Sequence, residues 1–296
     1  MYKGILSAIA GFFFFSSGDV IAKLLSKDGY DPFQISFLYA LVAALLLLAC
    51  SKSLGGVRAT FATRKKALHV LRGVLQAPTQ ALVFYAIARL PLSTAYAVIF
   101  LAPFLTAALA VPVLKERATV SRWMLIAAGF AGVLVALRPD TQDMSWAIVA
   151  VAVVACSAAA RNVLVVKMGP QETPLSLALF PSAAIVVFSA LPAMHGWTPL
   201  TSTTALAMLV GGVAFGAGLL LTALAFRYAP VSVAAPFHYT QIIWGVLAGM
   251  VLFGNPPDVW TLVGCGIIVL SGIALVRLRR PSSQAPVRAE AIVSVP

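Results

Sequence analysis

The chain has 296 residues, of which 61% are hydrophobic and only 10% are charged, and its mean hydropathy is +0.97. A soluble domain carries roughly a quarter of charged residues, so this composition excludes an ordinary soluble enzyme or binding domain. The formal net charge of +12 raises nucleic-acid binding as a function, but the positions of the basic residues, described below, argue against it.

Apolar runs recur along the whole chain, and a run of about 20 residues is long enough to cross a bilayer. They predict an all-α integral membrane protein with ten transmembrane helices and little sequence left for a soluble domain. The expected spans are 4–25, 33–50, 68–88, 92–113, 121–138, 145–166, 174–193, 204–226, 231–253 and 259–277.

The first span carries Asp19 and Lys23 four residues apart, on the same helix face as Ser16. This spacing and order favour an ion pair within the helix, and an unpaired charge inside a membrane is costly. Two interpretations remain open. The pair is either local, with Lys23 extending to the interface, or Asp19 belongs to an outer gate or a proton-coupling site.

The third span places Gln76, Thr79 and Gln80 on one face, close to Pro78, which is expected to kink the helix. At 1.5 Å per residue, Gln80 lies about 18 Å from the start of the span, near the middle of the membrane. These uncharged polar groups are candidates for substrate binding.

The sixth span places Ser157 at a similar depth, with Arg161 one turn closer to the cytoplasm and Asn162 beside it. We expect Ser157 to bind substrate, and Arg161 and Asn162 to act in gating or coupling. A purely structural role for Arg161 is the alternative.

The fourth and ninth spans carry aromatic and polar residues near mid-membrane. The fourth contains Tyr96 and Phe100, and in the ninth His238 and Gln241 are expected on one small, polar helix face with Gly245 and Gly249. This face is predicted to border a water-filled cavity. The substrate-binding candidates from these two spans are Tyr96, Phe100, His238, Tyr239, Gln241 and Trp244, and packing or interfacial roles are the alternative for the aromatic ones.

Most of the 21 lysines and arginines fall on one side when the loops are assigned alternately to the two faces. Cytoplasmic loops carry such an excess, so both termini are expected in the cytoplasm, and the basic charge indicates topology rather than nucleic-acid binding. A bacterial inner membrane is the expected location.

Residues 92–139 resemble residues 231–281 in their order of small residues, apolar helix, polar loop and basic helix end. Two five-span units are therefore predicted, 1–139 and 140–280, followed by a disordered cytoplasmic tail, 281–296. Because five is odd, the second unit is inverted relative to the first, as in many secondary transporters.

This layout, together with "PVLKER" at the end of the fourth span, resembles the drug/metabolite transporter superfamily in its ten-span EamA branch. The chain departs from the family pattern where Asn255 replaces the counterpart of Glu116. The apolar, aromatic-bearing spans are most similar to those of YddG-type amino-acid exporters, and the resemblance implies a transport function.

Nucleotide-binding, zinc-protease, CxxC and nucleophile-elbow motifs are absent from the sequence, so no enzyme, metal or cofactor is expected. Scarce mid-membrane charge favours a zwitterionic or neutral substrate. We expect export of aromatic or large neutral amino acids by alternating access, with the two halves rocking around a central cavity and with bends at Pro78, Pro103 and Pro236.

A broad exporter of lipophilic drugs or other metabolites is the alternative, and a non-transporting membrane sensor or assembly subunit is a second alternative. The expected partners are the small-molecule substrate and the lipid bilayer. Proton coupling and facilitated diffusion both fit the sequence, and so do a monomer and a homodimer.

Overall fold

A computed structural model describes residues 2–115, 119–138, 145–169, 171–228 and 235–278, and every regular element in these ranges is helical. The elements are α1 (Tyr2–Lys27), α2 (Pro32–Ala49), η1 (Ser51–Leu54), α3 (Val57–Phe61), α4 (Lys66–Arg89), α5 (Leu92–Ile99), α6 (Ala102–Leu114), α7 (Val120–Leu137), α8 (Trp146–Met168), α9 (Pro174–His195), α10 (Ser202–Tyr228), η2 (Ala235–Tyr239), α12 (Thr240–Phe253) and α13 (Val259–Leu278).

Over the described residues the helices coincide with the apolar runs, and eight helical segments are long and apolar enough to cross a membrane. The helix α4 falls outside this set because its polar stripe lowers its hydropathy, and the segment Phe237–Phe253 is too short. The protein is therefore a multi-pass helical membrane protein. Glu116, the boundary at 139/140, residues 231–234 and the tail 281–296 lie outside the described residues.

The fourth and ninth spans are interrupted near Pro103 and Pro236, where bends were expected. The fourth is broken between α5 and α6, where Phe100 and Leu101 form a turn. Pro103 lies in the first turn of α6 and has no N–H to donate to the Ile99 carbonyl, so the helix restarts there. In the ninth span, residues 235–239 form the 3₁₀ turn η2, and the α-helix starts only at Thr240.

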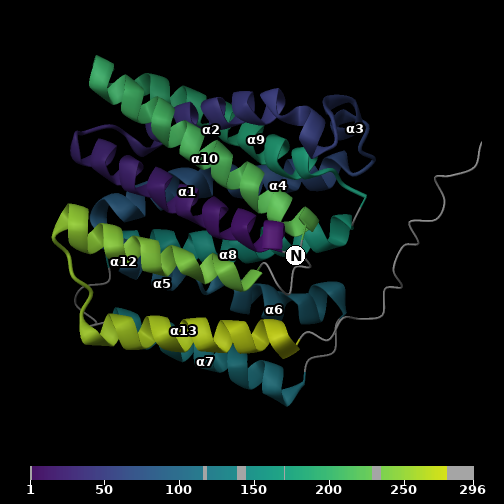
Figure 1. Ribbon diagram of the computed structural model, residues 1–296, viewed down its shortest axis with the longest axis vertical. Coiled ribbons are helices and arrows are strands. Elements are labelled where there is room, and N and C mark those ends of the chain that lie inside the picture. The colour runs from purple at the N-terminus through teal and green to yellow at the C-terminus, as the bar shows by residue number, and fades with distance from the viewer. Residues whose placement is uncertain (1, 116–118, 139–144, 170, 229–234, 279–296) are drawn as a thin grey trace, which may run out of the picture.

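Helices from the two halves of the chain interleave (Figure 1). Helix α1 packs against α10 and α12, and α8 packs against α4 and α6. The helices α7 and α13 lie together at one edge of the molecule, while α2 packs on both α9 and α10. Helices of each half therefore pack extensively against helices of the other.

Similar local structure recurs at corresponding positions of the two halves. Asp31 caps α2 and Thr173 caps α9, each through its side-chain oxygen and each followed by proline. Lys115 ends α6 with φ 55°, and Gly254, 139 positions later, ends α12 with φ 63°. A left-handed residue commonly ends a helix, although glycine adopts this conformation far more easily than lysine does.

Loops and helix ends are also tied together at both ends of the bundle. At one end, Tyr30 hydrogen-bonds to Thr204 at 2.7 Å, and the Gln34 amide donates to the Thr198 carbonyl at 2.8 Å. At the other end, Glu172 lies between α8 and α9 and contacts Nε2 of His69 at 2.8 Å.

Glu172 also accepts hydrogen bonds from the hydroxyls of Thr63 and Ser176. Burial alone would raise the pKa of Glu172, but the hydrogen bonds from His69, Thr63 and Ser176 together hold it below its ordinary value. Glu172 is therefore a charged junction that fastens the α8–α9 loop to the start of α4.

Helices α7 and α13 approach closely where Gly132 faces Gly264. A Cβ atom on Gly264 would lie 2.5 Å from the carbonyl oxygen of Gly132 and 2.6 Å from the Cβ of Ala136. Backbone atoms cannot move aside without separating the helices, so glycine is what permits this packing distance.

Gly264→Ala is expected to destabilise the protein by about 1–3 kcal/mol, because the added methyl group forces α7 and α13 apart. Gly266→Ala is the matched control on the same helix, since nothing lies within 4 Å of a Cβ atom there. Thermal unfolding of the two purified variants in detergent measures the difference. Equal unfolding temperatures would contradict the close approach.

Candidate functional site

The two broken helices meet at their breaks. Phe100 ends α5, Tyr239 ends η2, and their ring centroids lie 5.4 Å apart. Both side chains are buried, with Phe100 inaccessible and Tyr239 5% exposed. The sequence repeat pairs these two residues, and the structure brings them into contact in the core of the bundle.

His238 adjoins this pair and lies among aromatic rings. Its imidazole stacks on Phe12 of α1, with centroids 4.7 Å apart and planes 23° apart, and it meets Phe100 edge-on at 4.7 Å. Gln241 is buried one turn further along and lies within hydrogen-bonding reach of His238. His238 belongs to the 3₁₀ turn, so the expectation of a single α-helical face shared with Gln241 was wrong, although the two side chains remain neighbours.

Tyr96 joins the aromatic residues to an acidic group. Its hydroxyl donates a hydrogen bond of 2.7 Å to Asp19 of α1, and its ring packs against Gly245 of α12, where a Cβ atom would lie 2.5 Å from the ring. Tyr96 is 1% exposed. Tyr96, Phe100, His238, Tyr239 and Gln241 therefore form one cluster, called the aromatic cluster below.

The expected ion pair between Asp19 and Lys23 is not formed. Lys23 instead donates to the carbonyl of Leu90, at the end of α4, over 2.5 Å, and its ammonium lies 5.1 Å from the ring centroid of Phe253. The negative end of a helix dipole and an aromatic face both stabilise a cation. Helix spacing alone could not reveal these partners, because they lie on other elements.

Trp244 lies at the edge of this region rather than inside it. Its ring meets Phe13 edge-on at 5.2 Å, and Phe13 is 44% exposed on the outer surface of α1. The indole nitrogen of Trp244 is buried without a hydrogen-bond partner in the structure. No contact places Trp244 among the rings of the aromatic cluster.

A second group of predicted residues lies where α4 crosses α8. Ser157 donates to the Leu75 carbonyl at 2.9 Å, and Arg161 donates to the Thr79 hydroxyl oxygen at 2.7 Å. Thr79 and Gln80 are buried, and the Gln76 amide approaches Gln80 at 3.5 Å. This set, called the α4–α8 polar cluster, is defined as Gln76, Thr79, Gln80, Ser157 and Arg161.

Asn162 points away from that crossing. Its amide donates to Thr106 of α6 at 3.3 Å, and the residue is exposed. Although Asn162 follows Arg161 in the sequence, its side chain does not reach the α4–α8 polar cluster.

Arg72 belongs with the α4–α8 polar cluster but was not among the predicted site residues. It lies two turns before Thr79, and its guanidinium donates to the carbonyl of Leu177 on α9 at 2.6 Å. The residue four positions after Leu177 is Pro181, which has no N–H, so this carbonyl has lost its partner within the helix. That proline inside an apolar run is the sequence signal that could have indicated a polar partner.

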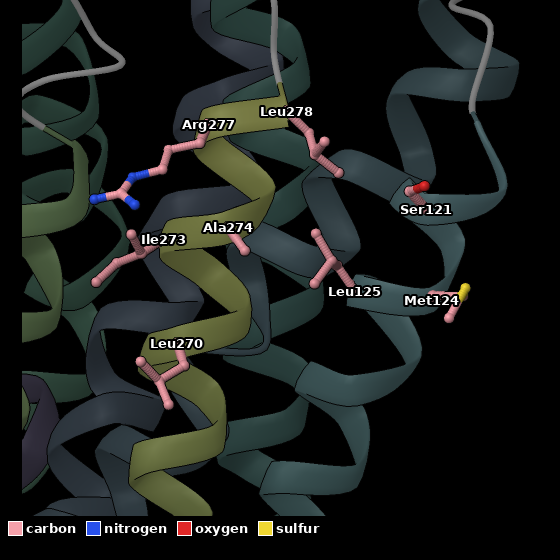
Figure 2. Close-up of a pocket in the computed structure, with 8 residues that line it drawn as sticks. All are labelled: Ser121, Met124, Leu125, Leu270, Ile273, Ala274, Arg277 and Leu278. Atoms are coloured by element: carbon pink, nitrogen blue, oxygen red, sulfur yellow. The ribbon is translucent and has the colours of Figure 1, made fainter.

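The expected water-filled cavity does not coincide with either of two hollows found in the described part of the structure. Figure 2 shows the larger of these two, about 510 Å³, between α7 and α13 and lined by Leu125, Leu270, Ile273 and neighbouring residues. The second is flanked by α1 and α10. Neither contains a predicted site residue, and the burial of Phe100, Tyr96 and Gln241 shows closely packed side chains at their positions.

The two clusters lie on helices that touch one another, since α1 contacts α4 and α5 contacts α8. Among the described residues, His, Cys, Asp and Glu do not gather in groups of three that could hold a metal ion. The arrangement offers aromatic faces, amides, hydroxyls, one carboxylate and guanidinium groups, which suit non-covalent recognition of a small molecule.

Comparisons with known proteins agree with this chemistry. The model of the EamA-like transporter family matches residues 2–138. An S-adenosylmethionine uptake transporter of Rickettsia conorii is 30% identical over 86% of this chain and 85% of the relative. A riboflavin transporter of Vibrio cholerae is 26% identical over 82% of each chain.

A pseudopaline exporter of Pseudomonas aeruginosa is 24% identical over 94% of this chain and 97% of the relative. A solved crystal structure, 17% identical in sequence, superposes with a TM-score of 0.65 over 95% of this chain and all of the other, which shows a shared fold. The chain therefore belongs to the EamA-like transporter family of the drug/metabolite transporter superfamily.

Proposed function

We propose that the protein is a secondary transporter for a small zwitterionic metabolite, either an amino acid or an amino-acid derivative such as S-adenosylmethionine. The observation that carries this proposal is the meeting of the two broken helices at Phe100 and Tyr239, with His238 stacked beside them. Helices broken at mid-membrane build the substrate sites of many transporters. Aromatic rings beside amides suit a substrate that has both an apolar or planar part and polar groups.

The two-repeat organisation supports an inverted arrangement of the halves. Equivalent caps begin α2 and α9, equivalent left-handed residues end α6 and α12, and both halves contain a broken helix. The packing of α1 on α10 likewise has its counterpart in the packing of α8 on α4. Together with the lysine and arginine bias of the loops, these similarities support our proposal that both termini lie in the cytoplasm of a bacterial inner membrane.

The moving units in this proposal are two mixed groups of helices. One consists of α1 and α10, and the other of α4, α6 and α8, which pack most extensively with one another, while α5 and α12 pack on each other where the groups meet. Each group contains helices from both halves. Alternating access then requires the groups to separate first on one side of the membrane and then on the other, with the closely packed aromatic cluster as the closed state.

The direction of transport is part of the proposal, and export of aromatic or large neutral amino acids is one form of it. The relatives include both uptake and export proteins, so sequence similarity favours neither direction. S-Adenosylmethionine combines an amino-acid group with a planar ring, and both parts match the groups in the two clusters.

Purified protein in liposomes is expected to transport radiolabelled S-adenosylmethionine, or an aromatic amino acid, in a saturable manner. His238→Ala and Gln241→Leu are expected to lower flux about tenfold, because each removes a polar group from the aromatic cluster. His195→Ala is the matched control, since His195 is exposed at the end of α9. Wild-type flux in both site variants would refute the site.

Asp19 is the group we propose for proton coupling. It is partly buried within the bundle, and its described hydrogen-bond partner is the Tyr96 hydroxyl rather than a cation. Lys23, the nearest cation in the sequence, is held by Leu90 instead. A carboxylate without a paired cation inside a membrane protein is costly when charged, which makes proton exchange a natural role for it.

An imposed pH gradient is expected to change substrate flux in the wild type but not in Asp19→Asn, because the variant has no carboxyl group to exchange a proton. Asp28→Asn, in the loop after α1, is the matched control and is expected to respond like the wild type. Flux in proteoliposomes with and without the gradient is the measurement. A wild type that ignores the gradient would exclude Asp19 as an obligatory proton carrier and indicate facilitated diffusion.

A further inference from the structure

Two arginines lie near each other in the α4–α8 region without an acidic partner. Arg72 of α4 and Arg161 of α8 are both partly buried, and Arg161 reaches Thr79, which lies two turns after Arg72 on α4, at 2.7 Å. Their guanidinium groups are therefore close enough for their charges to interact. Within the described ranges, the ion pairs involve other residues. Two guanidinium groups held together in an apolar bundle repel each other and lose hydration, so an anion between them would relieve both costs.

Among the residues that the structure describes, most donor groups of these arginines have no hydrogen-bond acceptor. One terminal nitrogen of Arg72 donates to Leu177, and one terminal nitrogen of Arg161 donates to Thr79. The Nε atom of Arg72 is buried and has no partner in the structure. A guanidinium has five N–H groups, so a ligand could still receive several hydrogen bonds from the pair.

A structural role explains only part of this arrangement. The carbonyl freed by Pro181 accounts for one hydrogen bond of Arg72. It accounts neither for a second arginine beside the first nor for the unpaired Nε. A single carbonyl needs only one hydrogen-bond donor. Two planar guanidinium groups, each with parallel N–H groups, suit the two oxygens of a carboxylate.

We propose that Arg72 and Arg161 together bind the carboxylate group of the transported metabolite. This inference rests on the proposed transport function and narrows its substrate class to metabolites that carry a carboxylate, in preference to analogues that lack one. In α4 and in α8 the arginine lies about 10 Å from the helix end at Lys66 or Met168, respectively. The pair can therefore receive the carboxylate while the rest of the substrate extends into the bundle.

Matched probes test the inference directly. S-Adenosylmethionine and L-phenylalanine are each compared with the decarboxylated analogue, in liposomes of phosphatidylcholine alone so that no anionic lipid headgroup competes. Whichever of the two metabolites the wild type transports is expected to bind about tenfold or more tightly than its own decarboxylated analogue. A charge-assisted hydrogen bond to the carboxylate would give a difference of this size.

Arg72→Gln and Arg161→Gln are each expected to reduce this preference to within about twofold, because each removes one of the two guanidinium groups that bind the carboxylate. The preference of Arg161→Lys for the carboxylate is expected to lie between those of Arg161→Gln and the wild type. Lysine keeps the positive charge but lacks the paired N–H groups of a guanidinium. Arg89→Gln is the matched control, because Arg89 lies on the same helix α4, is exposed and stacks on Tyr85.

A second measurement needs no transported substrate. Acetate at constant ionic strength is expected to raise the thermal unfolding temperature of the wild type and of Arg89→Gln, but not of Arg72→Gln or Arg161→Gln. Stabilisation by acetate without flux of any probe would support the anion site and overturn the transport proposal. Equal wild-type flux of a metabolite and its decarboxylated analogue would contradict binding of the carboxylate by the two arginines. A preference for the carboxylate that persists in both glutamine variants would contradict it as well. Either result would leave the proposal of a transport function intact.

Discussion

Inside a lipid-facing bundle, every backbone carbonyl that loses its helical partner must find another donor, and the polar interior of this protein follows from that constraint. Pro181 leaves the Leu177 carbonyl free, and Arg72 donates to it. The end of α4 leaves the Leu90 carbonyl free, and Lys23 donates to it. Irregular backbone thus draws cationic side chains into the bundle at defined positions, and it does so without acidic partners.

The same irregularity brings together the groups that can recognise a metabolite. The fourth and ninth spans each break near their centre, and the residues at the breaks, Phe100 and Tyr239, touch. Helix α1 contributes Asp19 and Phe12 to the same region through Tyr96 and His238. In the proposed transport mechanism, one mixed group of helices moves relative to the other and opens this region.

Much of this architecture can be predicted from the sequence, because long apolar runs predict membrane spans. Polar residues that recur on one helix face within such a run are also easily recognised. Gln80 and Ser157 are predicted at a similar depth, and α4 and α8, which carry them, pack together, with Ser157 donating to the Leu75 carbonyl. The partner of Asp19 could not be predicted, since spacing within one helix says nothing about Tyr96 on another. Arg72 was not predicted as a site residue, because its hydrogen bond to Leu177 depends on Pro181, more than a hundred residues away in the sequence.

The central claim is that the closely packed aromatic cluster opens alternately to the two sides of the membrane. Gln241→Cys, in a protein whose Cys50, Cys156 and Cys265 are replaced by serine, tests it with a membrane-impermeant thiol reagent applied from each side. The account predicts that the introduced thiol is modified from both sides and more slowly with substrate present. The control Ile243→Cys, on the exposed face of α12 at a depth similar to that of Gln241, stays unreactive because lipid covers it. A Gln241→Cys variant that is folded and transports substrate, yet reacts from neither side, would contradict it.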